Sequence, residues 1–280
     1  MGEKFGPIVA GKFYRDNPDD LIRQIEDCYT HEYGPGELPD VSNEELASPV
    51  GVVSPHAGYP YSGPVAAHAF RWLSEFGKPD SVVIIGTNHS GLGSAVSVLT
   101  EGSWETPLGS VEFDSDLGKE LLDFSDVLEE NSAPFNREHS IEVQLPFLQQ
   151  LWGEDFSIVP ICLKEQGQRV AEDISSALLQ SAPGGTLLLA STDFTHYESQ
   201  EIAEKKDGRA IDAIIDLDVE EFYRTVSENS ISICGAGSIG TLMDFAISKG
   251  LQPAKLQYAT SGEVSGYGRE VVGYGAIGFR

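Results

Sequence analysis

Three short clusters of metal-competent side chains each follow directly after a strongly apolar run. Runs of this kind, rich in Val, Ile and Leu, are typical of buried strands in a parallel sheet. In open α/β sheets the ligand crevice lies beyond the carboxyl ends of such strands, so the three clusters predict one shared site. The clusters are His56 after residues 50–53, His89 after residues 81–86, and Asp193 with His196 after residues 186–190.

The residue types in these clusters indicate a metal centre. A mononuclear redox metal such as Fe(II) is commonly held by two imidazoles and one anionic ligand, with positions left open for substrate or dioxygen. Zinc uses similar donors in a tetrahedral site with one open position. We expect His56 and His89 to supply the imidazoles, and the third donor is Cys234, Asp193 or His196.

The remaining pattern favours one three-layer α/β/α domain over residues 1–280, with a mostly parallel sheet, because strands and helices alternate along the chain. Strand 95–99 is expected to be an edge strand or one with an exposed face, and 104–113 a hairpin. Pro146 should kink a helix or lie in its first turn. The expected helices are 18–29 (N-cap Asn17), 63–76, 115–130, 140–152, 168–179, 201–217, 219–228 and 239–248 (ending at Gly250); further strands are 157–163, 256–258 and 271–279.

Charge is the outstanding feature of the composition. The chain has 44 acidic and 18 basic residues among 280, a net charge of −26. Such a surface disfavours nucleic acid, whose non-specific binding needs Lys and Arg, and it disfavours anionic membranes. No apolar run is long enough to cross a bilayer and the N-terminus does not resemble a signal peptide, so we expect a cytoplasmic protein. The charge further suggests a halophilic archaeon, whose high salt would screen self-repulsion.

Five segments stand out along the chain: Pro55–Gly63, Gly86–His89, Glu138–Pro146, Ser191–Tyr197 and Ile233–Gly235. They resemble, in order, the signature segments of the MEMO family, and the likeness runs from about Gly6 to the C-terminus. The family is similar in fold to the class III extradiol dioxygenases, the LigB-type proteins. Family members in animals are described as phosphotyrosine-peptide binders and as iron- or copper-linked redox proteins.

The resemblance implies metal ligands at His56, His89 and Cys234, with Asp193 and His196 lining the same pocket. His196 is then the candidate acid/base group. The LigB-type dioxygenases use a carboxylate where this chain has a cysteine, and a thiolate is a softer ligand. Ring cleavage therefore does not follow from the fold.

Several of these residues have a plainer interpretation. Asp193 and His196 would also suit the cap of a following helix, and free cysteines such as Cys234 are often small buried hydrophobes. His139 and Glu142 either begin a helix or lie at the pocket rim, where Tyr59 is a further candidate.

The leading hypothesis is a MEMO-family protein that holds one metal ion, iron or copper in preference to zinc, and is a possible metal-dependent oxidoreductase. Its partner would be a small molecule or a peptide, and it could form a homo-oligomer. One alternative is a non-catalytic module that binds a peptide or phosphopeptide in the same cleft. Another is a zinc-dependent hydrolase.

Overall fold

The computed structural model describes residues 2–42 and 44–280, and its centre is a mixed sheet whose middle strands are parallel. The strands are β1 (Glu3–Phe5), β2 (Val50–Ser54), β3 (Ser81–Thr87), β4 (Val96–Val98), β5 (Gly102–Thr106), β6 (Gly109–Phe113), β7 (Leu128–Glu130), β8 (Ser157–Leu163), β9 (Thr186–Ser191), β10 (His196–Glu198), β11 (Pro253–Thr260) and β12 (Val271–Phe279). The helices are α1 (Pro18–Thr30), α2 (Tyr59–Leu73), α3 (Ser115–Phe124), α4 (Leu145–Trp152), α5 (Gln168–Ser181), α6 (Gln200–Ile215), α7 (Val219–Glu228), α8 (Ala236–Lys249) and α9 (Ser261–Ser265).

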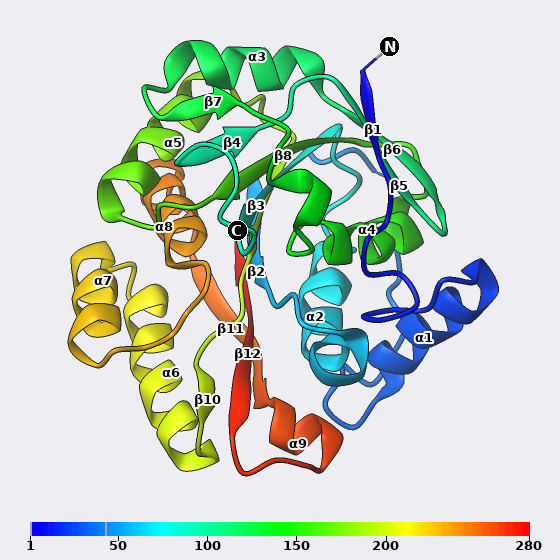
Figure 1. Ribbon diagram of the computed structural model, residues 1–280, viewed down its shortest axis with the longest axis vertical. Helices are drawn as coiled ribbons and strands as arrows, with labels where there is room; N and C mark the ends of the chain where they lie inside the picture. The colour runs from blue at the N-terminus through cyan, green and yellow to red at the C-terminus, as the bar shows by residue number, and fades with distance from the viewer. Residues whose placement is uncertain (1, 43) are drawn as a thin grey trace.

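The main path of the sheet runs β1-β5-β6-β8-β3-β9-β2-β12-β10. Its middle strands, from β6 to β2, are all parallel, whereas β12 pairs antiparallel with β2, β10 and β11. Figure 1 shows α1, α2 and α4 on one side of this sheet and α5 to α8 on the other. Because β2, β3 and β9 are parallel neighbours, their carboxyl ends meet at one edge, as the sequence predicts.

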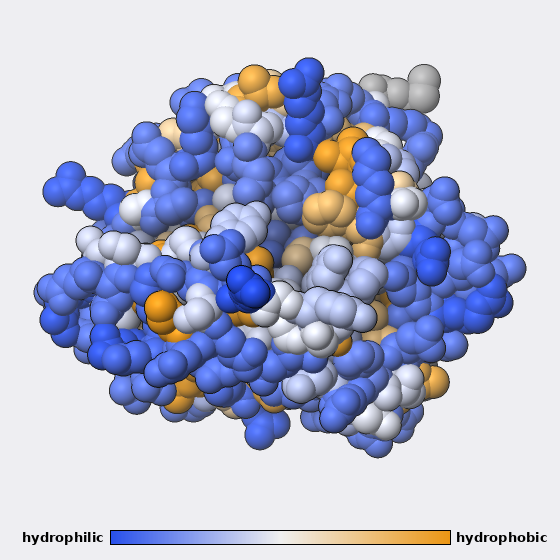
Figure 2. Space-filling model, turned by 60° about the horizontal axis from the view of Figure 1, so that its bottom comes forward, coloured by the Kyte–Doolittle hydropathy of each residue, from blue (hydrophilic) through white to orange (hydrophobic). Residues whose placement is uncertain are grey.

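The surface is mainly hydrophilic. Figure 2 shows a face on which hydrophilic residues predominate and hydrophobic residues are scattered in small groups. This matches a chain in which acidic residues far outnumber basic ones. Among the described residues, no helix is both long and apolar enough to span a bilayer.

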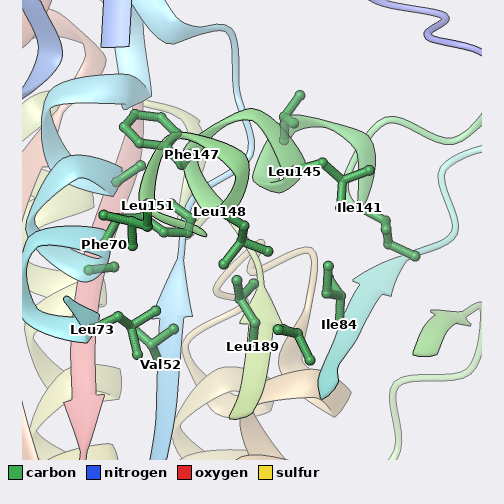
Figure 3. Packing of buried hydrophobic residues seen from close by; sticks show 14 of the residues in the cluster. Val52, Phe70, Leu73, Ile84, Ile141, Leu145, Phe147, Leu148, Leu151 and Leu189 are labelled. Carbon is green, nitrogen blue, oxygen red and sulfur yellow. The ribbon is translucent and has the colours of Figure 1, made fainter. Parts of the chain in front are cut away.

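Both faces of the sheet are buried. Along β2, Val52 belongs to the core beneath α1, α2 and α4, whereas Val53 belongs to the core beneath α5 and α8. Successive side chains of a strand point to opposite faces, so a strand that is apolar throughout must be covered on both sides. Figure 3 shows the first core, where Phe70 of α2 and Phe147 of α4 pack together. Their rings stack with centroids 4.7 Å apart and planes 5° apart.

Four expectations for local structure are confirmed. The strands expected at 50–53, 81–86 and 186–190 are β2, β3 and β9, and the hairpin expected at 104–113 is β5 with β6. The Asn17 side chain caps α1 by accepting a hydrogen bond from the Asp20 N–H. Gly250 follows α8 in the left-handed conformation, which favours glycine.

Three other expectations are wrong. Segment 95–99 is not an edge strand, because β4 is fully buried between β7 and β8. The helix expected over 115–130 ends at Phe124, and the last three residues instead form β7 against β4. The helix expected over 140–152 begins at Leu145, after a 3-10 turn at 142–144, and Pro146 lies in its first turn, where a missing N–H costs little.

A buried carboxylate on α6 holds the chain between β9 and β10. Asp207 accepts hydrogen bonds from the backbone N–H and the hydroxyl of Thr195, at 3.0 and 2.6 Å, and from the Tyr258 hydroxyl, at 2.7 Å. Thr195 in turn accepts a bond from the Gly273 N–H of β12. This network fixes the turn that carries Asp193 and His196.

Replacing this carboxylate should destabilise the fold. We expect Asp207→Ala to lower the free energy of unfolding by roughly 2–5 kcal/mol, because it leaves three buried donors without an acceptor. Urea denaturation measures the change. Asp212→Ala on the exposed face of the same helix is the control, and an equal loss in both variants would contradict the role given to Asp207.

Candidate metal site

Three predicted ligands meet at the carboxyl edge of the sheet. His56 follows β2, His89 follows β3, and Cys234 lies just before α8. Ligand atoms of the three side chains all lie within 4.8 Å of one another. The Cys234 Sγ is 3.2 Å from the His56 Nε2, and the centroids of the two imidazole rings are 5.2 Å apart. One ion could therefore contact all three donors.

A serine determines which ring nitrogen of His56 is the hydrogen-bond donor. The Ser191 hydroxyl donates its one proton to the Ser140 carbonyl, at 2.6 Å, and also contacts the His56 Nδ1, at 3.0 Å. Since that proton is already used, the His56 Nδ1 must be the donor in the second contact. The lone pair of this imidazole is consequently on Nε2, which faces Cys234. The Gln144 amide donates a third bond to the Ser191 hydroxyl and fixes its position.

A buried glutamate orients His89 in the same way. The Glu138 carboxylate is 3.0 Å from the His89 Nδ1 and also accepts the His89 backbone N–H. A carboxylate behind a ligating imidazole is a common support for metal sites. Burial would raise the pKa of Glu138, but its hydrogen bond to His89 and the charge of that ring lower it to about 2. Glu138 is therefore an anion that directs the His89 Nε2 toward the site.

His89 itself holds a proton firmly. Burial lowers the pKa of His89, but hydrogen bonds to Cys234 and Glu138 outweigh burial and raise it to about 9. About a third of its side chain is exposed (35%), so water can reach the ring. A cation bound at Nε2 would take the place of this proton, and binding should release it.

The thiol of Cys234 is held by the segment after β9. The backbone N–H of Asp193 donates to the Cys234 Sγ at 3.1 Å, and the Thr192 hydroxyl lies 3.6 Å from the same sulfur. The backbone N–H of Cys234 donates back to the Asp193 carbonyl. These contacts fix the position of the sulfur, the atom through which a cysteine binds a metal. Cys28 and Cys162, by contrast, are buried in the hydrophobic core.

His139 joins the cluster as a third imidazole. Its ring stacks on His89 with centroids 4.7 Å apart and lies 5.5 Å from the His56 ring. Burial and the neighbouring His56 lower the pKa of His139 to about 4, so the ring is neutral at pH 7. His139 was expected either to begin a helix or to lie at the pocket rim, and its position supports the second interpretation.

A pocket of about 430 Å³ opens beside these rings. Asp193 and His196 both line it, as expected. The His196 Nδ1 donates to the Ser232 carbonyl at 2.9 Å, and in the described part of the chain no hydrogen bond engages its Nε2. Neither residue caps the next helix, because Ser199 is the N-cap of α6. The Asp193 carboxylate accepts the backbone N–H of His56, at 2.8 Å, and so supports the main chain and not the imidazole ring.

Two residues expected at the pocket rim lie elsewhere. The Glu142 side chain is fully buried and accepts bonds from the backbone N–H groups of Ile8 and Val9 and from the Tyr14 hydroxyl, which anchors the N-terminal segment. The Tyr59 ring is buried as well, and its hydroxyl donates to the Val143 carbonyl. Tyr59 borders a different cavity, of about 580 Å³, between α1 and α2.

Sequence reasoning did not identify the residues that set the imidazole tautomers. Ser191 and Glu138 stood within the recognised segments, but nothing in their spacing pairs them with His56 and His89, which are 135 and 49 residues away. Tyr197 was also missed as a pocket residue. Its backbone is left-handed (φ 58°), an unusual conformation for a bulky residue and one that often marks a functional site.

Comparison with known proteins places the chain in a family. The family model described as Memo-like protein matches residues 6–278. A MEMO1 family protein of Methanopyrus kandleri is 45% identical over 98% of both chains, and one of Thermotoga maritima is 49% identical over 96% of both. A crystal structure of the uncharacterized protein JW3007 from Escherichia coli aligns with TM-score 0.56 and 9% identity, covering 82% of this chain and 99% of that one, which shows a shared fold alone. The chain therefore belongs to the Memo-like family.

Proposed function

We propose that this protein binds one metal ion through His56, His89 and Cys234 and acts as a metal-dependent oxidoreductase on a small molecule. The observation that carries the proposal is the arrangement of donors: two imidazoles, each fixed with Nε2 toward the site, and one thiol within 4.8 Å of both. Mixed imidazole and thiolate donors suit iron, copper and zinc. Iron or copper is our preferred metal, and zinc is the alternative.

The pocket beside this centre has groups suited to moving a proton. His196 offers a free Nε2, and His139 is neutral and stacks on a proposed ligand. We assign His196 the role of acid/base and Asp193 a supporting role, because its carboxylate fixes the main chain of His56. A metal held here would supply open coordination positions for a substrate or dioxygen.

A relationship to the LigB-type dioxygenases is part of this proposal and rests on the sequence motifs. Ring cleavage is not part of it, since Cys234 stands where those enzymes use a carboxylate. The pocket lining gives little support to the phosphopeptide alternative, because a phosphate group needs basic side chains. Among the described residues that line the pocket, Lys12 is the one Lys or Arg. A zinc hydrolase would use the same three ligands. Identifying the metal that the purified protein retains distinguishes this alternative from the oxidoreductase.

Removing a ligand should remove the metal. We expect purified protein to carry about one iron or copper per chain by elemental analysis, and His56→Ala and Cys234→Ala to lose most of it, because two remaining donors hold a metal weakly. His31→Ala and Cys28→Ala, which change the same residue types outside the site, are the controls. Metal content that is unchanged in both ligand variants would reject the site, and zinc in place of iron or copper would favour the hydrolase.

Glu138 should tune metal affinity without contacting the metal. We expect Glu138→Gln to weaken binding roughly 10–100-fold, because a neutral amide orients the His89 ring less firmly and makes it a poorer donor. Competition with a chelator measures the affinity, and circular dichroism checks the fold. Glu120→Gln, on the exposed face of α3, removes an equal charge elsewhere. Equal affinity for Glu138→Gln and Glu120→Gln would exclude the supporting role.

We also propose that the chain works in a high-salt cytoplasm, and this proposal rests on the net charge of −26 alone. Unscreened repulsion at this charge should destabilise the folded state, and salt shortens its range to about 3 Å at 1 M. The expected result is a melting temperature that rises between low and molar KCl. A melting temperature that is flat or falls with KCl would reject salt adaptation.

A further inference from the structure

A second cavity lies beside the pocket of about 430 Å³, at the first turn of α2. Its volume is about 670 Å³, and it shares Pro60 and Tyr61 with the smaller pocket. Its other lining residues come from α9 and from the loop before β12: Ser261, Ser265, Tyr267, Gly268 and Glu270. The two cavities therefore adjoin at Pro60 and Tyr61.

The lining of this outer cavity has one sign of charge. Glu270 is its single ionisable carboxylate, and in the described part of the chain no hydrogen bond or ion pair engages that side chain. Arg269 is exposed and is not among the lining residues. Two tyrosines complete the walls, with Tyr61 49% exposed and Tyr267 85% exposed.

The loop backbone keeps Tyr267 on the surface. Gly266 and Gly268, on either side of it, have positive φ angles of 72° and 131°. Side chains rarely adopt such angles, so the two glycines allow a tight loop with its one aromatic ring projecting outward. The Tyr267 side chain therefore contributes little to the hydrophobic core and forms part of the cavity wall instead.

We propose that this outer cavity is a subsite for a cationic nitrogen group, an ammonium or guanidinium, at the far end of a ligand whose other end lies at the metal centre. The inference rests on the proposed function and names the substrate class: a small molecule with a metal-binding head and a positively charged tail. Tyrosine faces attract such cations, and an unpaired carboxylate gives them a charged partner. The negative charge of the whole chain adds a long-range attraction of the same sign.

The test uses ligands that differ only in the tail. We would measure, by calorimetry on metal-loaded protein, the affinities of 1-(ω-aminoalkyl)imidazoles, the matching ω-carboxylates and neutral alkyl analogues over a series of chain lengths. The imidazole head binds any of the three metals. We expect the ammonium series to bind roughly tenfold more tightly than the carboxylate series at the best length, a ratio that corresponds to a single good charge contact.

Two variants separate the local contact from the general field. Glu270→Gln should reduce the preference for ammonium several-fold, whereas Glu32→Gln, which removes an exposed carboxylate outside the cavity, should preserve it. Tyr61→Ala should weaken the ammonium series more than the alkyl series. An equal reduction in Glu270→Gln and Glu32→Gln, or no tail preference in a protein that retains its metal, overturns the subsite and leaves the metal centre standing. Protein that holds no metal, or binds no imidazole head, overturns the proposed function and the subsite with it.

Discussion

The candidate site depends on one buried carboxylate. Glu138 accepts N–H bonds from the main chain of His89, His139 and Ser140, and it contacts the His89 ring as well. It thus ties the loop after β3 to the segment before α4, which lie 49 residues apart in the chain. A buried anion costs several kcal/mol unless its lone pairs are satisfied, and here four donors satisfy them. The placement of His89 follows from that requirement.

The sheet imposes the rest of the arrangement. With both faces of the middle strands covered by helices, the open places for polar groups are the ends of the strands. β2, β3 and β9 end side by side, so the residues after them must share a small volume. The tautomer of His56 then follows from Ser191, the last residue of β9, and not from any neighbour in the sequence. Polar side chains are therefore absent from most of the two covered faces of the middle strands and gather at the strand ends.

The sequence predicted the parts that depend on local pattern. Apolar runs located β2, β3 and β9, and the rule that ligands bind at strand ends brought His56 and His89 together. The prediction failed where a neighbour distant in sequence determines whether a strand is buried. β4 is buried because β7 and β8 flank it, and its short alternating pattern did not reveal these neighbours. Glu142 was expected either to begin a helix or to lie at the pocket rim, but its three side-chain hydrogen bonds come from residues near the N-terminus, more than a hundred positions away.

The charge of the chain affects which molecules can approach the candidate metal site. The pocket holds histidines, one aspartate and one lysine, and His139 is neutral at pH 7. The field of a chain with net charge −26 raises the local concentration of cations and lowers that of anions. A metal ion gains from this field on approach, whereas a phosphate or carboxylate ligand must overcome it. This field therefore suits the centre that we propose, which would take up a cation and then admit a ligand whose negative charge, if any, is confined to the end that meets the metal.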